Sequence, residues 1–76
     1  MLRHTITREF SESTVEATFE ETGEHDLVRV ISYRRRWRGS TRAKRVKRME
    51  GKIYQLHQIT GEPPPSEYAE EPAAAT

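Results

Sequence analysis

The chain has no cysteine among its 76 residues, and this absence excludes several classes of site. Without cysteine there is no disulfide framework, no cysteine-ligated zinc site and no thiol nucleophile. A long apolar run is also missing, because Arg29 interrupts the most apolar stretch, residues 27–33. A transmembrane helix needs about 20 mostly apolar residues, so we expect no membrane span. The first residues are not followed by the apolar region of a signal peptide, so we expect a cytoplasmic protein, or one inside a virion or another large assembly.

Patterns that carry catalysis or cofactor binding are missing too. The sequence has no glycine-rich phosphate loop and no G-x-S-x-G motif. Its three histidines, His4, His25 and His57, fall in three different predicted elements and show no spacing typical of metal ligands. A chain of this length rarely encloses an enzyme pocket. We therefore expect a protein that is not an enzyme and that holds no cofactor and no metal ion.

Charge of one sign is scarce in each part of the chain, although the net charge is only +1. Residues 1–26 carry two basic and seven acidic side chains, a net of −5. Residues 27–61 carry eleven basic side chains against Glu50 alone, a net of +10, and residues 62–76 carry four acidic side chains and no basic one. Segregation on this scale favours contact with a polyanion, and it equally allows neutralisation inside the fold.

Alternation of apolar and polar residues predicts three strands in the first half of the chain. The first covers residues 2–10, and the second, the most regular, covers residues 14–21. A connection at residues 22–26, with Gly23 available for a positive φ, leads to a third strand at residues 27–37. The apolar side chains that the first two strands would turn inward are Ile6, Phe10, Val15, Ala17 and Phe19.

Two registers are open for the third strand. One turns Val28 and Val30 to the core, and the other buries Ile31, Tyr33 and Trp37. A slip of one residue exchanges the two faces of a strand, and the sequence alone does not choose between them.

After residue 40 the spacing of apolar residues changes and predicts one helix packed on the sheet. The apolar stripe consists of Ala43, Val46, Met49, Ile53 and Leu56. Ser40 or Thr41 would cap its start, and Gly61 followed by prolines would end it. Gly51 in its middle costs about 1 kcal/mol relative to alanine. An alternative ends the helix at Gly51 and makes residues 52–59 a fourth strand; we favour the continuous helix.

Together these elements predict a small α+β domain over residues 1–61, a three-stranded antiparallel β-meander with one C-terminal α-helix packed on it. Its core would combine the inward residues of the strands with the apolar stripe of the helix. Residues 62–76 are rich in Pro, Ala and Glu and contain no large aliphatic side chain. This composition predicts a disordered acidic tail.

The stretch YRRRWRGSTRAKRVKR, residues 33–48, contains nine Arg or Lys side chains and no acidic one. On a helix, several of them would be like-charged neighbours three or four residues apart, which destabilises the helix unless a counter-charge is present. Phosphates are one such counter-charge, because neutralising them releases condensed counterions. Arginine also offers a planar fork for phosphates and guanine edges. The candidate contact residues are Tyr33, Arg34, Arg35, Arg36, Trp37, Arg38, Arg42, Lys44, Arg45, Lys47 and Arg48.

The two aromatic residues of this stretch, Tyr33 and Trp37, lie among the arginines. Exposed aromatic rings beside arginine stack on unpaired bases. They also anchor protein interfaces, and a third interpretation places Trp37 in the core between sheet and helix. The basic side chains themselves would be neutralised internally if Glu16 and Glu20, or the acidic tail, faced them.

From these features we expect a non-enzymatic accessory or regulatory protein that binds DNA or RNA through residues 33–48. One alternative is a small protein-binding inhibitor or adaptor of the kind carried by phages and mobile elements, which would act on an acidic protein surface. Another is a structural component of a virion or a large assembly. The sequence does not distinguish DNA from RNA as the partner.

Overall fold

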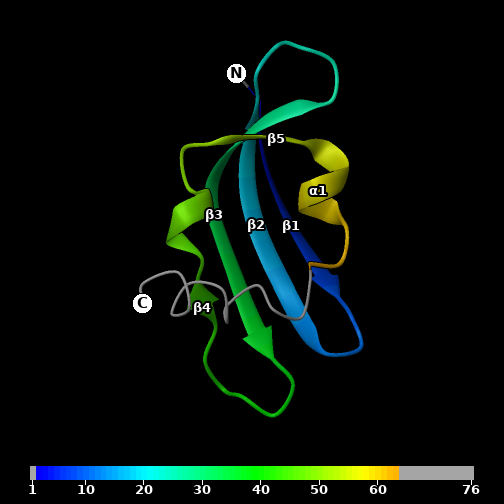
Figure 1. Cartoon of the computed structure of the whole chain (residues 1–76), viewed down its shortest axis with the longest axis vertical. Helices are drawn as coiled ribbons and strands as arrows, with labels where there is room; N and C mark the ends of the chain where they lie inside the picture. The colour runs from blue at the N-terminus through cyan, green and yellow to red at the C-terminus, as the bar shows by residue number, and fades with distance from the viewer. Residues whose placement is uncertain (1, 64–76) are drawn as a thin grey trace, which may run out of the picture.

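Five strands form one curved antiparallel sheet in the computed structural model, which describes residues 2–63 (Figure 1). The strands are β1 (Arg3–Glu9), β2 (Ser13–Glu21), β3 (Leu27–Trp37), β4 (Lys44–Arg45) and β5 (Ile53–Gln55). A 3-10 helix, η1 (Lys47–Met49), lies between β4 and β5, and the short helix α1 (Leu56–Thr60) follows β5. The fold is therefore broadly α+β, with five strands where the sequence predicts three.

The long strand β3 organises the sheet. β2 pairs with it along one edge, while its other edge pairs with β5 at residues 27–29 and with β4 at residues 34–35. β1 in turn pairs with β2 over its full length. The three strands predicted from alternation are confirmed, and β3 has the bounds that the sequence predicts.

A β-bulge decides the register of β3. The pairing shifts between Thr18 and Phe19 of β2, which leaves Ile31 as an extra residue on β3. Even-numbered residues such as Val30 face the core before the bulge, and odd-numbered residues such as Tyr33 face it afterwards. Each of the two predicted registers is therefore right for one half of the strand.

The continuous helix predicted after residue 40 is wrong, because the chain there forms β4, η1 and β5. Its backbone bonds to β3: the amide of Val46 donates to the carbonyl of Tyr33, and the amide of Gly51 donates to the carbonyl of Val30, both at 2.8 Å. Gly51 has a φ of 81°, a left-handed conformation that an α-helix excludes and that glycine adopts without strain. The like charges that would crowd one helix are thereby spread over a hairpin and a 3-10 turn.

The alternative that ends the helix at Gly51 is right in part. β5 is a strand where that alternative places one, but α1 replaces its second half. A capping box starts α1, in which the amide of Gln55 donates to Oε1 of Gln58 at 2.9 Å. The predicted stop at Gly61 is confirmed, since its amide donates to the carbonyl of His57 at 3.0 Å.

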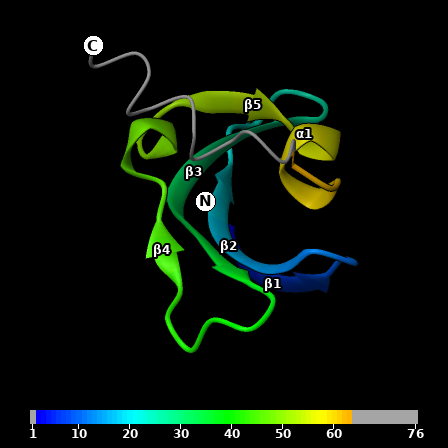
Figure 2. The ribbon, with the colours of Figure 1, turned by 60° about the horizontal axis from the view of Figure 1, so that its bottom comes forward.

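The core lies on the concave side of the sheet, and Figure 2 shows how strongly the strands curve. In the same view α1 lies at one side of the concave face and η1 at the other. The buried apolar residues are Val15, Ala17, Phe19, Val28, Val30, Tyr33, Val46, Met49 and Ile59. Ile53, predicted for the core as part of a helix, is 45% exposed because β5 turns it to the outer face beside Arg29.

Of the predicted tail, only Glu62 and Pro63 belong to the described residues, and Pro63 is buried. The prediction of disorder for residues 64–76 lies outside that part of the chain. Within residues 2–63 no helix is long and apolar enough to cross a membrane.

Candidate nucleic-acid interface

The nine basic side chains of the candidate site lie on one β-hairpin and the 3-10 turn that follows it. We call residues 34–48 the basic hairpin; it contains the second half of β3, a loop at residues 38–43, β4 and the first two residues of η1. Gly39, with a φ of 83°, turns the chain after β3. The amide of Arg38 donates to the carbonyl of Glu12 at 2.9 Å, which ties the loop to the β1–β2 turn. β4 folds back along β3 near one end of the sheet (Figure 1), so the basic residues of these two strands are neighbours in the pairing.

Pairing between β3 and β4 places like charges opposite each other. Arg34 pairs with Arg45, and Arg35 pairs with Lys44. Like charges directly opposite each other destabilise neighbouring strands, whereas opposite charges there contribute roughly 0.2–1 kcal/mol. A counter-charge near such a pair relieves the repulsion.

Two of the predicted contact residues are buried, since Tyr33 and Arg35 are each 1% exposed. The Nε of Arg35 donates to the hydroxyl of Ser13 at 2.7 Å, and its guanidinium lies 3.9 Å from the centroid of the Trp37 ring. Such partners are needed inside a protein, because burying an unpaired charge is costly. Tyr33 and Arg35 therefore support the fold and do not face a ligand at the surface. Trp37 is half-buried, and the Arg35 guanidinium stacks on its ring.

This correction to the predicted contact surface follows from the bulge. Without it, alternation from Val28 and Val30 would turn Arg34 and Arg36 inward and leave Tyr33 outside. The extra residue reverses the faces, so Arg34 and Arg36 are exposed.

One cation of the basic hairpin is neutralised by its own chain. The guanidinium of Arg45 donates to both carboxylate oxygens of Glu50, at 2.7 and 2.9 Å. This hydrogen bond is the main cause that lowers the pKa of Glu50; partial burial opposes it, and the charges of Arg45, Lys47 and Arg34 add to it. The same contact raises the pKa of Arg45. Arg45 therefore reaches an external anion only in competition with Glu50.

Six other basic side chains of the hairpin are exposed. They are Arg34, Arg36, Arg38, Arg42, Lys44 and Lys47. Arg34 and Arg36 lie on the outer face of β3, whereas Arg38 and Arg42 belong to the loop, in which the Ser40 hydroxyl accepts a hydrogen bond from the amide of Arg42 at 3.3 Å. Arg48, the middle residue of η1, is half-buried. The six charges surround the tip and both sides of the hairpin.

Two acidic residues of β2, Glu20 and Glu21, contact side chains of β1. Glu20 accepts a hydrogen bond from Arg3 at 3.1 Å, and Glu21 lies 2.8 Å from His4 Nε2, so both face β1. Glu16 is opposite Arg34 in the pairing of β2 with β3, and it is exposed. The internal counter-charge at the basic hairpin is Glu50, which was not considered from the sequence. Glu16 lies opposite Arg34 in the strand pairing, and Glu20 contacts β1 instead.

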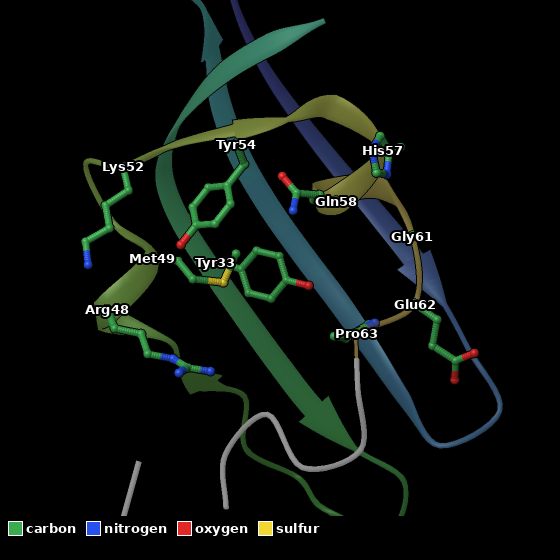
Figure 3. A pocket seen from close by; sticks show the side chains of 10 residues that line it. All are labelled: Tyr33, Arg48, Met49, Lys52, Tyr54, His57, Gln58, Gly61, Glu62 and Pro63. Atoms are coloured by element: carbon green, nitrogen blue, oxygen red, sulfur yellow. The ribbon is translucent and has the colours of Figure 1, made fainter. Parts of the chain in front are cut away.

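A second feature, not predicted from the sequence, is an open cavity of about 570 Å³ between η1, β5 and α1. Tyr33, Met49 and Tyr54 form its middle, with Arg48 and Lys52 on one side (Figure 3). The other side is formed by His57, Gln58, Gly61, Glu62 and Pro63. No sequence motif predicts this cavity, because residues from β3, η1, β5 and α1 form it only after the chain has folded.

The histidines remain apart in the fold. His4 lies beside Glu21, His25 lies 3.1 Å from Asp26, and His57 Nε2 lies 2.7 Å from Oε1 of Gln55. In the part of the chain that the structure describes, no group of three His, Asp or Glu side chains is placed to hold a metal ion.

Comparison of the chain with protein-family models, with curated proteins and with solved structures gives no match. What the chain binds must therefore be inferred from its own charges and geometry. The cluster of exposed cations on the basic hairpin is the strongest feature for this purpose.

Proposed function

We propose that the chain is a small, non-enzymatic nucleic-acid-binding module that contacts phosphates through the basic hairpin. The observation that carries this proposal is the exposure of six basic side chains on a hairpin that contains no acidic residue. Phosphates fit this surface because their neutralisation releases counterions, a favourable term that grows with each contact.

The shape of the hairpin agrees with the proposal. A two-stranded β-ribbon is one of the elements that the major groove of B-DNA admits. The loop arginines, Arg38 and Arg42, are at its tip, where they would meet phosphates or guanine edges first.

Base stacking contributes little in this proposal. Tyr33 is buried, and the ring of Trp37 carries the guanidinium of Arg35 on one face. Affinity would therefore come mainly from phosphate contacts, and these carry no sequence information. We expect similar affinity for different sequences of one length.

Fluorescence anisotropy with labelled duplex DNA, single-stranded DNA and RNA across a salt series tests the proposal. If the six exposed cations each neutralise one phosphate, the logarithm of the association constant on duplex DNA falls by about 5 for each tenfold increase in salt. Affinity that is flat in salt, or no binding at low salt, would contradict the proposal.

A matched pair of double variants locates the contact. Arg38→Ala with Arg42→Ala removes two cations from the loop, and the salt slope should become shallower by about 2. Arg3→Ala with Arg29→Ala removes two exposed cations from the opposite end of the sheet, and it should leave the slope unchanged. Equal effects of the two double variants would mean that binding follows net charge and not the hairpin.

An acidic protein surface would meet the same cations. A pull-down that retains one protein partner after nuclease treatment, together with weak binding to all three nucleic acids, would favour that partner over the proposal.

A further inference from the structure

The cavity between η1, β5 and α1 has a surface suited to a segment that is both aromatic and acidic. Its volume of about 570 Å³ lies within the range of about 300–1,000 Å³ common for ligand sites. Tyr54 supplies a half-buried ring, the buried side chains of Tyr33 and Met49 complete the apolar lining, and Arg48 and Lys52 supply positive charge on one side (Figure 3). Lys52 is exposed and Tyr54 is half-buried, so both are accessible from the cavity mouth.

The described chain leads into this cavity. After α1, residues Gly61, Glu62 and Pro63 form the side of the cavity that faces Arg48 and Lys52 (Figure 3). Residues 64–76 therefore begin at the cavity rim. Thirteen residues in an extended, proline-rich conformation span about 40 Å, more than the longest extent of the structure, 35 Å. They are long enough to cross the cavity and contact its basic side.

The chemistry of residues 64–76 complements the cavity. The segment contains Glu67, Glu70 and Glu71, no basic residue, and one aromatic residue, Tyr68. Tyr68 lies directly beside Glu67 in sequence. Tyrosine suits such a site because it offers a large apolar body and a polar tip.

We propose that the cavity is the docking site of the chain's own acidic segment, residues 64–76. The Tyr68 ring packs against Tyr54 and Met49, and the glutamates face Arg48 and Lys52. A short connection gives the segment an effective concentration in the millimolar range, so weak contacts suffice for docking. Docking does not depend on nucleic acid. If the proposed function also holds, the docked glutamates compete with phosphate for Arg48, which belongs to both the cavity and the basic hairpin.

Paramagnetic relaxation enhancement on the full chain tests this proposal in the absence of nucleic acid. Because the chain has no cysteine, Ala69→Cys accepts a single nitroxide label beside Tyr68 and keeps every charge. At low salt, the amide signals of Lys52, Tyr54 and Gln58 should lose most of their intensity, and high salt should restore it. Even broadening over the whole domain, or broadening concentrated on the loop at residues 38–43, would overturn the proposal.

Two charge reversals in the labelled chain provide the matched control. Lys52→Glu places an acid on the cavity wall and should abolish most of the broadening at Tyr54 and Gln58. Lys47→Glu makes the same change at an exposed position that does not line the cavity, and the broadening should persist. The dispersed amide spectrum of each variant checks that the sheet is intact. Persistence of the broadening in Lys52→Glu would count against an electrostatic contact here.

A mixture of labelled chain without ¹⁵N and unlabelled chain with ¹⁵N distinguishes the occupants. Docking within one chain predicts no broadening in this mixture. Broadening of Tyr54 there would show that the segment docks on a second copy, which would overturn docking within the chain. Since no nucleic acid is present, failure of this test leaves the proposed function untouched, and the salt series decides that function separately.

Discussion

The β1–β2 ribbon and the β3–β4 hairpin are both antiparallel strand pairs of one sheet, but they arrange charge in opposite ways. Across β1 and β2, Arg3 lies opposite Glu20 and their side chains pair at 3.1 Å. Across β3 and β4, Arg34 lies opposite Arg45, and Arg35 lies opposite Lys44. The first pair satisfies its charges within the sheet. The second gathers charge of one sign, of which only Arg45 has a carboxylate partner described above, Glu50, and this is why we propose that it contacts an external anion.

If the proposed function holds, stability and binding depend on different residues of the same strand pair. Buried groups such as Arg35 and Tyr33 hold β3 to its neighbours, while exposed ones such as Arg36 and Arg38 contribute little to the fold. Neighbours in sequence can therefore have unrelated roles, because alternation in a strand sends them to opposite faces.

The largest expected effect comes from two adjacent arginines. Arg35→Ala removes the donor to Ser13, the guanidinium over Trp37 and a buried volume, so we expect the free energy of unfolding to fall by about 3 kcal/mol. Arg36→Ala, on the exposed face, should change it by less than about 0.5 kcal/mol. Urea denaturation followed by Trp37 fluorescence measures both. Similar losses for the two variants would mean that β3 does not have the faces described.

Much of this arrangement of strands could be predicted from local patterns. β2 alternates most regularly, and its apolar residues Val15, Ala17 and Phe19 all lie in the core as expected. The bulge at Ile31 could not be predicted, because a strand with one extra residue has the same kind of composition as a strand without it. For that reason the sequence predicted the basic cluster but misassigned Tyr33 and Arg35 to its surface.

The helix predicted after residue 40 failed for a related reason. Val46 and Met49 are buried as their spacing suggests, but spacing records which residues face the core and not the backbone that brings them there. The edge of β3 offers hydrogen bonds to this segment, and a positive φ at Gly51 lets the chain return along it. Hydrogen bonds to β3 therefore decide the conformation of residues 44–55. The cavity beside β5 depends on this conformation, so the sequence did not predict it either.

Gly51 gives the next largest effect and tests this conformation directly. In a helix, Gly51→Ala would stabilise the protein by about 1 kcal/mol. At a φ of 81° the same substitution should lower the free energy of unfolding by about 1–2 kcal/mol, because alanine is strained in the left-handed region. An added Cβ meets no atom within 4 Å, so the effect would come from the backbone alone. A higher urea midpoint for Gly51→Ala would contradict the positive φ at Gly51 and support the continuous helix instead.

The third effect concerns the internal counter-ion of the basic hairpin and depends on pH. The pKa of Glu50 in the folded chain lies below its ordinary value of 4.5, mainly because of the hydrogen bond from Arg45. A lowered carboxyl pKa stabilises the folded state above the unfolded value, and that contribution is lost as the pH falls through the folded value. Glu50→Gln should therefore be less stable than the parent chain at pH 7, and the difference in urea midpoint should shrink below about pH 4.5. Arg45→Gln should give the same loss at pH 7, and the double variant should lose no more. A difference that persists unchanged in acid would exclude this ion pair as its source.

Glu50→Gln should also have a smaller effect, on DNA binding, which distinguishes the β3–β4 hairpin from the β1–β2 ribbon. In Glu50→Gln, Arg45 no longer has its carboxylate and becomes available to a phosphate, so the salt slope on duplex DNA should steepen by about 0.9. Stability falls while phosphate contact rises, which is expected only where the fold and the ligand compete for one cation. Glu20→Gln, which releases Arg3 in the β1–β2 ribbon, should leave the slope unchanged because that cation lies away from the hairpin. A steeper salt slope in both variants would show that any released cation on the domain contributes to DNA binding. The two strand pairs would then differ in their position on the sheet and not in their contribution to binding.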